Sequence, residues 1–174
     1  MWYVVQVVGG REESVACKIQ KQVDEDTFKS CFIPKYEIRK RYSGAWKTRQ
    51  EVLFPGYVFV DTSTPDLFRV ELNKVDVMTK LLSGFNDSGD RQFVPLSDDE
   101  KTLISAFVGG EDYVLKMSEG IIEGDQIRIL KGPLQGYEAL VKKIDRHKRI
   151  AFIDLEILGR VKTVKVGLEI VQKR

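Results

Sequence analysis

The residues with the clearest chemical capacity in this sequence are basic and crowd together near its carboxyl end. Residues 142–149, Lys-Lys-Ile-Asp-Arg-His-Lys-Arg, hold five Lys and Arg and one acid. Such a density of cations binds phosphate groups, with an affinity that falls as salt rises. A solvated face that keeps the protein soluble is the other interpretation of a charge run.

The charge of the chain is unevenly distributed. The whole sequence carries a net charge of +2. Residues 119–174 hold 12 Lys and Arg against 8 Asp and Glu, a net charge of +4, whereas residues 1–118 hold 16 against 18, a net charge of −2. The basic surface therefore belongs to the last third of the chain.

Residues that support enzyme chemistry are scarce. His147 is the single histidine, so a histidine-based metal site or catalytic triad has almost nothing to build on. The sequence contains no Walker-type phosphate loop, dinucleotide-binding glycine motif, H-E-x-x-H or G-x-S-x-G. The acids at 98–100 follow Ser97 in the S-x-x-E pattern that caps a helix. We predict no catalytic residue, metal or cofactor; a hydrolase whose carboxylates pair only in space ranks last.

Cysteine usage and hydropathy indicate the compartment. Cys17 and Cys31 do not have Cys-x-x-Cys spacing, and we expect both to be reduced and buried. No run approaches the roughly 20 apolar residues that a membrane helix needs. The apolar start at 2–8 lacks a basic leader and breaks at a Gly-Gly pair, which favours a strand over a signal peptide. The prediction is a cytoplasmic protein with no membrane partner.

The elements that position these residues fall into two parts. In the first, Val15, Ala16, Ile19 and Val23 share one face of a helix. The patterns predict strands at 2–8, 28–34, 56–61 and 77–82, helices at 12–23, 63–74 and 98–109, and a polar hairpin at 36–41 and 46–53. This order predicts an α/β sandwich with a largely antiparallel sheet over residues 1–110.

The second part contains strands only. Residues 111–118 lack strong periodicity, and we expect a linker there. Short β-branched strands at 126–130, 138–145, 150–155 and 161–166 alternate with Gly-containing or basic turns. Closely spaced strands of this kind predict a small SH3-like β-barrel over residues 119–174. The fold class is thus α+β.

Residues 54–60, Phe-Pro-Gly-Tyr-Val-Phe-Val, form the most specific string in the chain. The Pro-Gly pair bends the backbone, after which Tyr57 and Phe59 project from one face of a strand. Alone, such aromatics are typical of a core. Preceded by the Trp-Tyr-Val-Val strand at 2–5, however, the string closely resembles the NusG family of transcription elongation factors.

The second part resembles the same family independently. Residues 124–138 resemble the KOW motif that opens the NusG C-terminal barrel, and residues 156–160 resemble its later Gly-Arg turn. Ala139 stands where KOW motifs usually carry glycine. After the Gly-Arg turn, Lys162 and Lys165 stand where the family tends to have a neutral residue and an acid. These departures imply a specialised paralogue, similar to LoaP-type or RfaH-type antiterminators. The LoaP type is favoured, because the β-branched barrel strands give little support to the helical hairpin of the RfaH type.

The resemblance implies a non-enzymatic elongation and antitermination factor. It would bind elongating bacterial RNA polymerase and suppress pausing or termination. The N-terminal, NGN-like domain is expected to bind the clamp helices of the polymerase's largest subunit through an apolar patch. The alternative is that these residues pack in the core. The patch residues are Trp2, Tyr3, Phe54, Pro55, Gly56 and Tyr57. Basic hairpin residues are expected near upstream or non-template DNA, with solubility as the alternative: Arg39, Lys40, Arg41, Lys47 and Arg49.

The barrel is expected to bind a nascent RNA hairpin. Aromatics near the basic run are few, Tyr137 being the best candidate, which favours recognition of phosphate and shape over base stacking. In housekeeping members the resemblance places contacts with ribosomal protein S10 or Rho on this surface, and the lysines at 162 and 165 are expected to weaken those contacts here. A ribosome-associated RNA-binding KOW protein is the alternative function. The RNA-binding set is Lys131, Lys142, Lys143, Arg146, His147, Lys148, Arg149, Arg160, Lys162 and Lys165.

Overall fold

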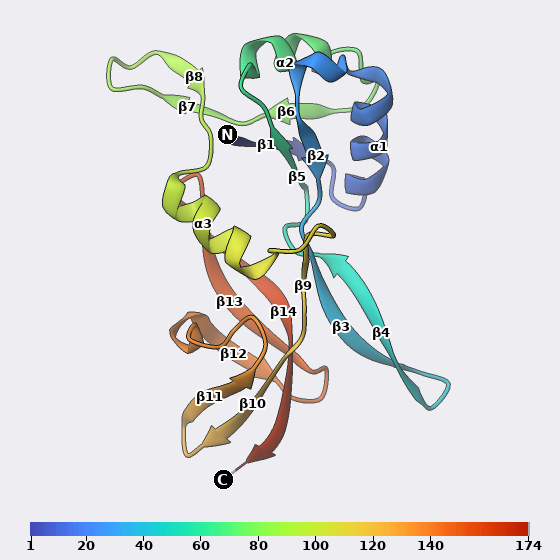
Figure 1. Ribbon diagram of the computed structural model, residues 1–174, viewed down its shortest axis with the longest axis vertical. Helices are drawn as coiled ribbons and strands as arrows, with labels where there is room; N and C mark the ends of the chain where they lie inside the picture. The colour runs from blue at the N-terminus through green and yellow to red at the C-terminus, as the bar shows by residue number, and fades with distance from the viewer. Residues whose placement is uncertain (174) are drawn as a thin grey trace. The chain divides into compact units, whose positions relative to one another are not determined.

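A computed structural model describes residues 1–173 and divides the chain into two compact units (Figure 1). The first unit contains residues 1–33 and 54–101, and the second contains residues 34–53 together with the chain from 102 onward. The polar hairpin predicted at 36–41 and 46–53 therefore belongs to the same unit as the barrel. The domain boundaries expected at 110 and 119 divide the chain at positions in the sequence. The two units are instead groups of residues that contact one another in space.

The first unit is built on an antiparallel sheet of four strands in the order β2-β5-β1-β6. The strands are β1 (Trp2–Val7), β2 (Ser30–Phe32), β5 (Tyr57–Asp61) and β6 (Thr79–Leu81). Val4 pairs with Phe59 and Val5 with Val58, and all four side chains are fully buried. The predicted antiparallel sheet is confirmed, with its core on β1 and β5.

Helices α1 (Glu12–Gln22) and α2 (Pro65–Leu72) and the short η1 (Glu25–Thr27) complete this part of the unit. Val15 and Ile19 are buried on α1, which packs on β2 and β5 (Figure 1). The predicted buried pair of cysteines is only half right. Cys31 lies in the core on β2, but Cys17 is exposed on the outer side of α1.

A hairpin and a helix follow β6 along the chain. Strands β7 (Ser83–Phe85) and β8 (Arg91–Phe93) form a hairpin that the sequence patterns did not predict. Helix α3 (Asp98–Phe107) begins with the expected capping box. The Ser97 Oγ accepts the Glu100 N–H at 3.1 Å, and the Glu100 carboxylate accepts the Ser97 N–H at 2.9 Å.

The second unit contains the predicted barrel, whose strands run in the order β11-β10-β14-β13-β12. They are β10 (Ser118–Glu123), β11 (Gln126–Lys131), β12 (Val141–Asp145), β13 (Ile150–Ile157) and β14 (Arg160–Lys173), with η2 (Glu138–Leu140) before β12. Strands β10 and β14 pair in parallel and the other neighbours are antiparallel. Ile153, Leu155, Val166 and Leu168 fill the interior.

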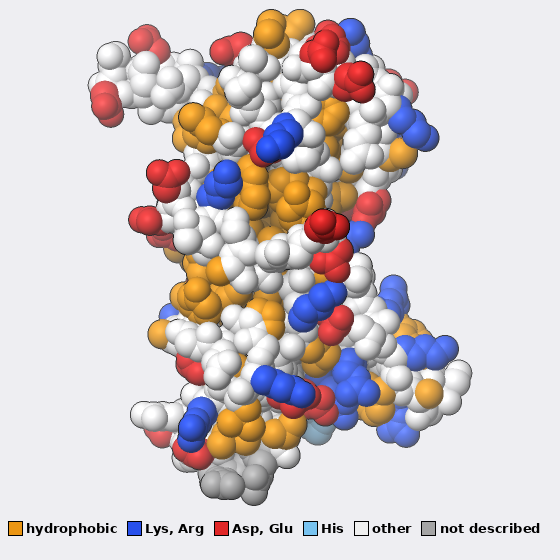
Figure 2. Space-filling view, viewed as in Figure 1, with side chains coloured by type: hydrophobic (Ala, Val, Ile, Leu, Met, Phe, Trp, Pro, Cys, Tyr) orange, Lys and Arg blue, Asp and Glu red, His pale blue; other side chains and the backbone are white. Residues whose placement is uncertain are grey.

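The remaining sheet of the second unit is the hairpin of β3 (Lys35–Tyr42) and β4 (Ala45–Val52). Ser43 and Gly44 turn it with φ of +49° and +82°, which matches the mirror-image turns that suit hairpins. Strand β9 (Val114–Leu115), within the expected linker, pairs in parallel with the start of β3. Lys and Arg side chains gather over the hairpin in Figure 2.

Candidate functional site

The Phe-Pro-Gly-Tyr string forms a tight turn at the start of β5. The Tyr57 N–H donates to the Phe54 carbonyl oxygen at 3.1 Å, and Gly56 has φ of +84°. Proline followed by a residue with positive φ is typical of a type II turn. The Gly56 carbonyl oxygen accepts the Val7 N–H at 2.8 Å, which joins the turn to the end of β1.

A buried carboxylate holds the same turn. Glu12, 3% exposed at the start of α1, accepts the Gly56 N–H at 2.7 Å and the Gly10 N–H at 3.2 Å. Burial raises the pKa of Glu12, but hydrogen bonds from the N–H groups of Gly56, Glu12 itself and Gly10 outweigh it, so the net pKa is lowered. Sequence reasoning missed this anchor, because an acid in the first turn of a helix signals only the helix dipole.

The residues expected to form an apolar surface patch are mostly internal. Trp2, Tyr3 and Phe54 are buried, and Trp2 meets Phe32 edge-on with ring centroids 5.0 Å apart. The expected patch is wrong in this respect, because β1 is a central strand buried on both faces. Pro55 is exposed and Gly56 and Tyr57 are half-buried, so the accessible part of this candidate site is the turn itself.

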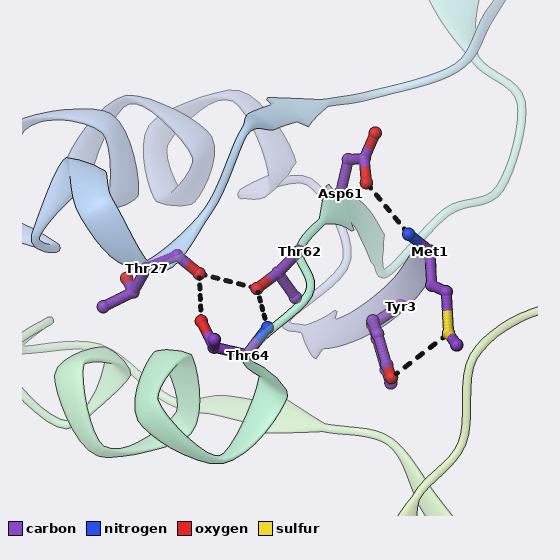
Figure 3. A network of polar contacts seen from close by, with 6 residues as sticks. All are labelled: Met1, Tyr3, Thr27, Asp61, Thr62 and Thr64. Carbon is purple, nitrogen blue, oxygen red and sulfur yellow. Dashed lines mark hydrogen bonds and ion pairs between the residues drawn. The ribbon is translucent and has the colours of Figure 1, made fainter.

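Polar contacts fix the beginning of β1 beside the end of β5 (Figure 3). The Met1 amino group lies 3.1 Å from the Asp61 carboxylate, and the Tyr3 hydroxyl donates to the Met1 sulfur at 3.8 Å. The Thr62 hydroxyl donates to the Thr27 carbonyl oxygen at 2.6 Å. These contacts give Tyr3 a structural role.

Two of the five basic hairpin residues are engaged by carboxylates. Arg39 lies 3.5 Å from Glu169 on β14, and Lys40 forms an ion pair with Glu51 on β4. The hydrogen bond from Lys40 lowers the pKa of Glu51 despite the opposing effect of burial, and the Tyr36 hydroxyl adds a second donor at 2.7 Å. Both basic side chains are thus held close to the sheet.

The other three basic hairpin residues are exposed. The Arg49 guanidinium donates a hydrogen bond to the Tyr42 hydroxyl. Arg41 and Lys47 form no ion pair with any described residue. Of the expected DNA-proximal set, Arg41 and Lys47 carry the charge that is most available to an external phosphate.

The β12–β13 turn presents the most compact part of the expected RNA-binding set. Arg146, His147 and Lys148 are exposed, and the Lys148 N–H donates to the Asp145 carboxylate at 3.0 Å. Arg149 adopts the left-handed region with φ of +56° and is half-buried. A non-glycine residue held there carries local strain, a feature that often accompanies functional sites.

Three more members of the set lie on the strands next to this turn. Lys143 on β12 and Lys165 on β14 flank Phe152 of β13 in register, and the Lys143 ammonium lies 5.8 Å from the Phe152 ring centroid. Lys142 is exposed where the pairing of β12 with β13 shifts register. The sheet therefore places these cations close to the turn.

The remaining expected residues lie elsewhere. Arg160 follows the far end of β13, a strand of 8 residues that spans roughly 25 Å. Lys162 is half-buried and faces the opposite side of β14 from Lys165, because side chains three positions apart in a strand diverge. Lys131 lies 3.6 Å from the Glu119 carboxylate on β10. The structure thus separates Arg160 and Lys162 from the residues at the β12–β13 turn, and it pairs Lys131 with an acid.

The described residues show two further negative findings. Nowhere in residues 1–173 do three His, Cys, Asp or Glu side chains gather in a way that could hold a metal ion. No helix in the same range has the length and apolar character required to cross a membrane.

The comparisons with known proteins agree with these two regions. Residues 1–105 match the family described as Transcription termination factor nusG, and residues 123–154 match the KOW motif. The Transcription termination/antitermination protein NusG of Thermus thermophilus is 29% identical over 99% of this chain and 97% of its own length. That of Xylella fastidiosa is 26% identical over 99% and 98%.

A solved structure gives the same result in three dimensions. The structure described as "Domain interaction in Thermotoga maritima NusG" shares 26% identity, with a TM-score of 0.55 over 95% of this chain and 92% of that one. The family match covers the anchored Phe-Pro-Gly-Tyr turn, and the KOW match covers the basic β12–β13 turn. With more than half of its length matched, this chain belongs to the NusG family.

Proposed function

We propose that this chain is a bacterial transcription elongation and antitermination factor that acts in the cytoplasm on elongating RNA polymerase. The observation that carries the proposal is the rigid Phe54–Tyr57 turn, anchored by Glu12 and β1 and presenting Pro55 at the surface. Relatives named as termination/antitermination proteins match over nearly the whole chain, which supports the same role.

The polymerase contact is tested by removing the aromatic ring of the turn. Tyr57→Ala should weaken binding of the full chain to core RNA polymerase by about 10-fold or more, because a central aromatic commonly contributes about 2 kcal/mol to an interface. Phe85→Ala is the matched control, since it removes a ring that is 75% exposed elsewhere on the first unit. Equal affinity for Tyr57→Ala and the unmodified chain would overturn the assignment.

The barrel is proposed to bind structured nascent RNA. The support is the exposed turn at 146–148 with Lys142, Lys143 and Lys165 close by. Each phosphate contact removed should flatten the slope of log affinity against log salt by about one unit. The test measures this slope for a variant in which four barrel residues are changed together to alanine: Lys142, Arg146, Lys148 and Arg149. The control variant changes four exposed cations of the first unit instead: Arg11, Lys21, Lys29 and Lys80.

Two finer parts of the proposal concern the paralogue type and the DNA. The β-structure of residues 118–173 and the lysines at 162 and 165 support a LoaP-type member with weakened contacts to ribosomal protein S10 or Rho. Arg41 and Lys47 are proposed to approach upstream or non-template DNA. Site-specific crosslinking from position 47 in an assembled elongation complex tests this, and the absence of any DNA adduct would refute it.

A further inference from the structure

The second unit contains a groove that joins the two basic regions. It has a volume of about 430 Å³, and its walls come from the β3–β4 hairpin and from the barrel. The hairpin contributes Arg39, Lys40 and Arg41 with the rings of Tyr42 and Trp46. The barrel contributes His147, Lys148 and Lys165. Residues assigned separately to DNA and to RNA from the sequence thus line one surface.

Close backbone packing fixes the two walls relative to each other. Gly167 of β14 lies against β3, where a Cβ atom would stand 2.2 Å from the Glu37 carbonyl oxygen. The Glu169 carboxylate lies 3.5 Å from Arg39 and 3.3 Å from Arg149, so it bridges hairpin and barrel. The groove is therefore a built feature of the unit, and Gly167 is required where β14 packs on β3.

The Trp46 indole lines this groove, and the Arg149 guanidinium stacks on one side of it. The Arg149 guanidinium carbon lies 3.8 Å from the Trp46 ring centroid. The backbone carbonyl oxygen of Arg149 accepts the Leu168 N–H at 3.0 Å. Trp46 nevertheless remains 37% exposed, and Tyr42 is 36% exposed. A stacked cation on one side orients the indole while part of its surface stays open to solvent.

The cations of the groove are partly neutralised and partly available. Glu51 engages Lys40 and Glu169 engages Arg39, whereas Arg41 and Lys148 form no ion pair with any described residue. Open aromatic rings among unpaired cations are the combination by which proteins bind unpaired nucleotides, with bases stacked on rings and phosphates on Lys and Arg. The sequence disfavoured stacking because aromatics near the basic run are few, with Tyr137 as the best candidate. In the structure Tyr137 packs edge-on against Phe107, with ring centroids 4.9 Å apart.

We propose that this groove binds an unpaired segment of RNA, with a base stacked on Trp46 and its phosphates on Lys148 and Lys165. The inference rests on the proposed RNA binding by the barrel and adds a second wall to that site. The volume falls within the range of about 300–1,000 Å³ typical of small-ligand pockets, which suits a single extruded nucleotide. The RNA bound by the barrel would then be recognised at a loop or bulge as well as along its stem.

The test titrates the full chain with fluorescent probes of one sequence: an RNA stem-loop, the same stem-loop with abasic loop positions, and the loop sequence as single-stranded DNA. Trp46→Leu keeps apolar bulk without a ring, and Trp46→Phe keeps a ring. Thr48→Ala is the matched control, since Thr48 is exposed on the same strand but does not line the groove. Circular dichroism confirms that each variant is folded.

The expected result is specific to the unpaired base. Trp46→Leu should bind the intact stem-loop about 5- to 100-fold more weakly, since stacking of one base contributes that much to affinity. Trp46→Phe and Thr48→Ala should bind it within about threefold of the unmodified chain. The abasic stem-loop should bind the unmodified chain and Trp46→Leu equally.

The outcomes separate this site from the broader function. If no RNA probe binds, both the RNA-binding function and the groove assignment fail. If the intact stem-loop binds and the fourfold alanine variant weakens it but Trp46→Leu does not, only the groove assignment fails. Tighter binding of the DNA probe than of the stem-loop, with the same dependence on Trp46, would overturn the choice of RNA.

Discussion

Replacing Glu12 tests whether one buried carboxylate positions the Phe-Pro-Gly-Tyr turn. Glu12→Ala leaves the Gly10 and Gly56 N–H groups without their acceptor. Each unsatisfied donor costs about 1–3 kcal/mol, and the low end applies because both bonds are only partly buried. We expect a loss of about 2–3 kcal/mol for Glu12→Ala and about 1 kcal/mol for Glu12→Gln, which keeps an acceptor oxygen.

Urea unfolding followed by tryptophan fluorescence measures this loss. With a slope of about 2 kcal/mol/M, Glu12→Ala should lower the unfolding midpoint by about 1 M. Glu13→Gln is the matched control, because Glu13 is exposed in the same first helical turn. That change removes the same charge from the helix dipole without touching the two hydrogen bonds.

The pH dependence supplies the second criterion. The pKa of Glu12 in the folded chain is lowered from 4.5, so the stability from its ionised form is fully present above about pH 5 and is lost as the pH falls toward the lowered pKa. The difference between Glu12→Gln and the unmodified chain should therefore shrink between about pH 5 and pH 3. Equal midpoints for Glu12→Gln and Glu13→Gln at pH 7, or a difference that does not change with pH, would refute the anchor.

Three further predictions concern local structure. Ser97→Ala should lower the free energy of unfolding by about 1 kcal/mol, measured by urea titration, because it removes the cap of α3. Burial raises the pKa of Cys31 to about 12, so at pH 8 a thiol reagent should label only Cys17 until urea unfolds the chain; labelling of both in the native state would contradict this. Gly132→Ala should unfold the barrel at markedly lower urea, because its Cβ would lie 2.6 Å from the Ser118 Cα; an unchanged midpoint would show that the barrel adapts.

Local patterns in the sequence determined much of this protein. Alternation of apolar residues predicts most strands of the two units, although not β7, β8, β9 or β10. The Ser97–Glu100 spacing predicts the start of α3, because these signals depend on neighbours within a few positions. The order of the Phe-Pro-Gly-Tyr string and the KOW motif identifies the family. Both the α+β class and the family assignment are confirmed.

Only the tertiary structure decided which of these residues share a surface. Trp2 lies in the core because β1 is central in its sheet, and Phe54 lies there because its ring packs on Phe59 of β5. Neither strand order nor such a ring contact is written in local periodicity. Trp46 meets Arg149 across more than 100 positions of sequence, and α1 and three strands separate Glu12 from Gly56 along the chain. The close packing of Gly167 on β3 brings the hairpin and the barrel together. Basic and aromatic residues that are far apart in the sequence therefore line a single groove once the chain is folded.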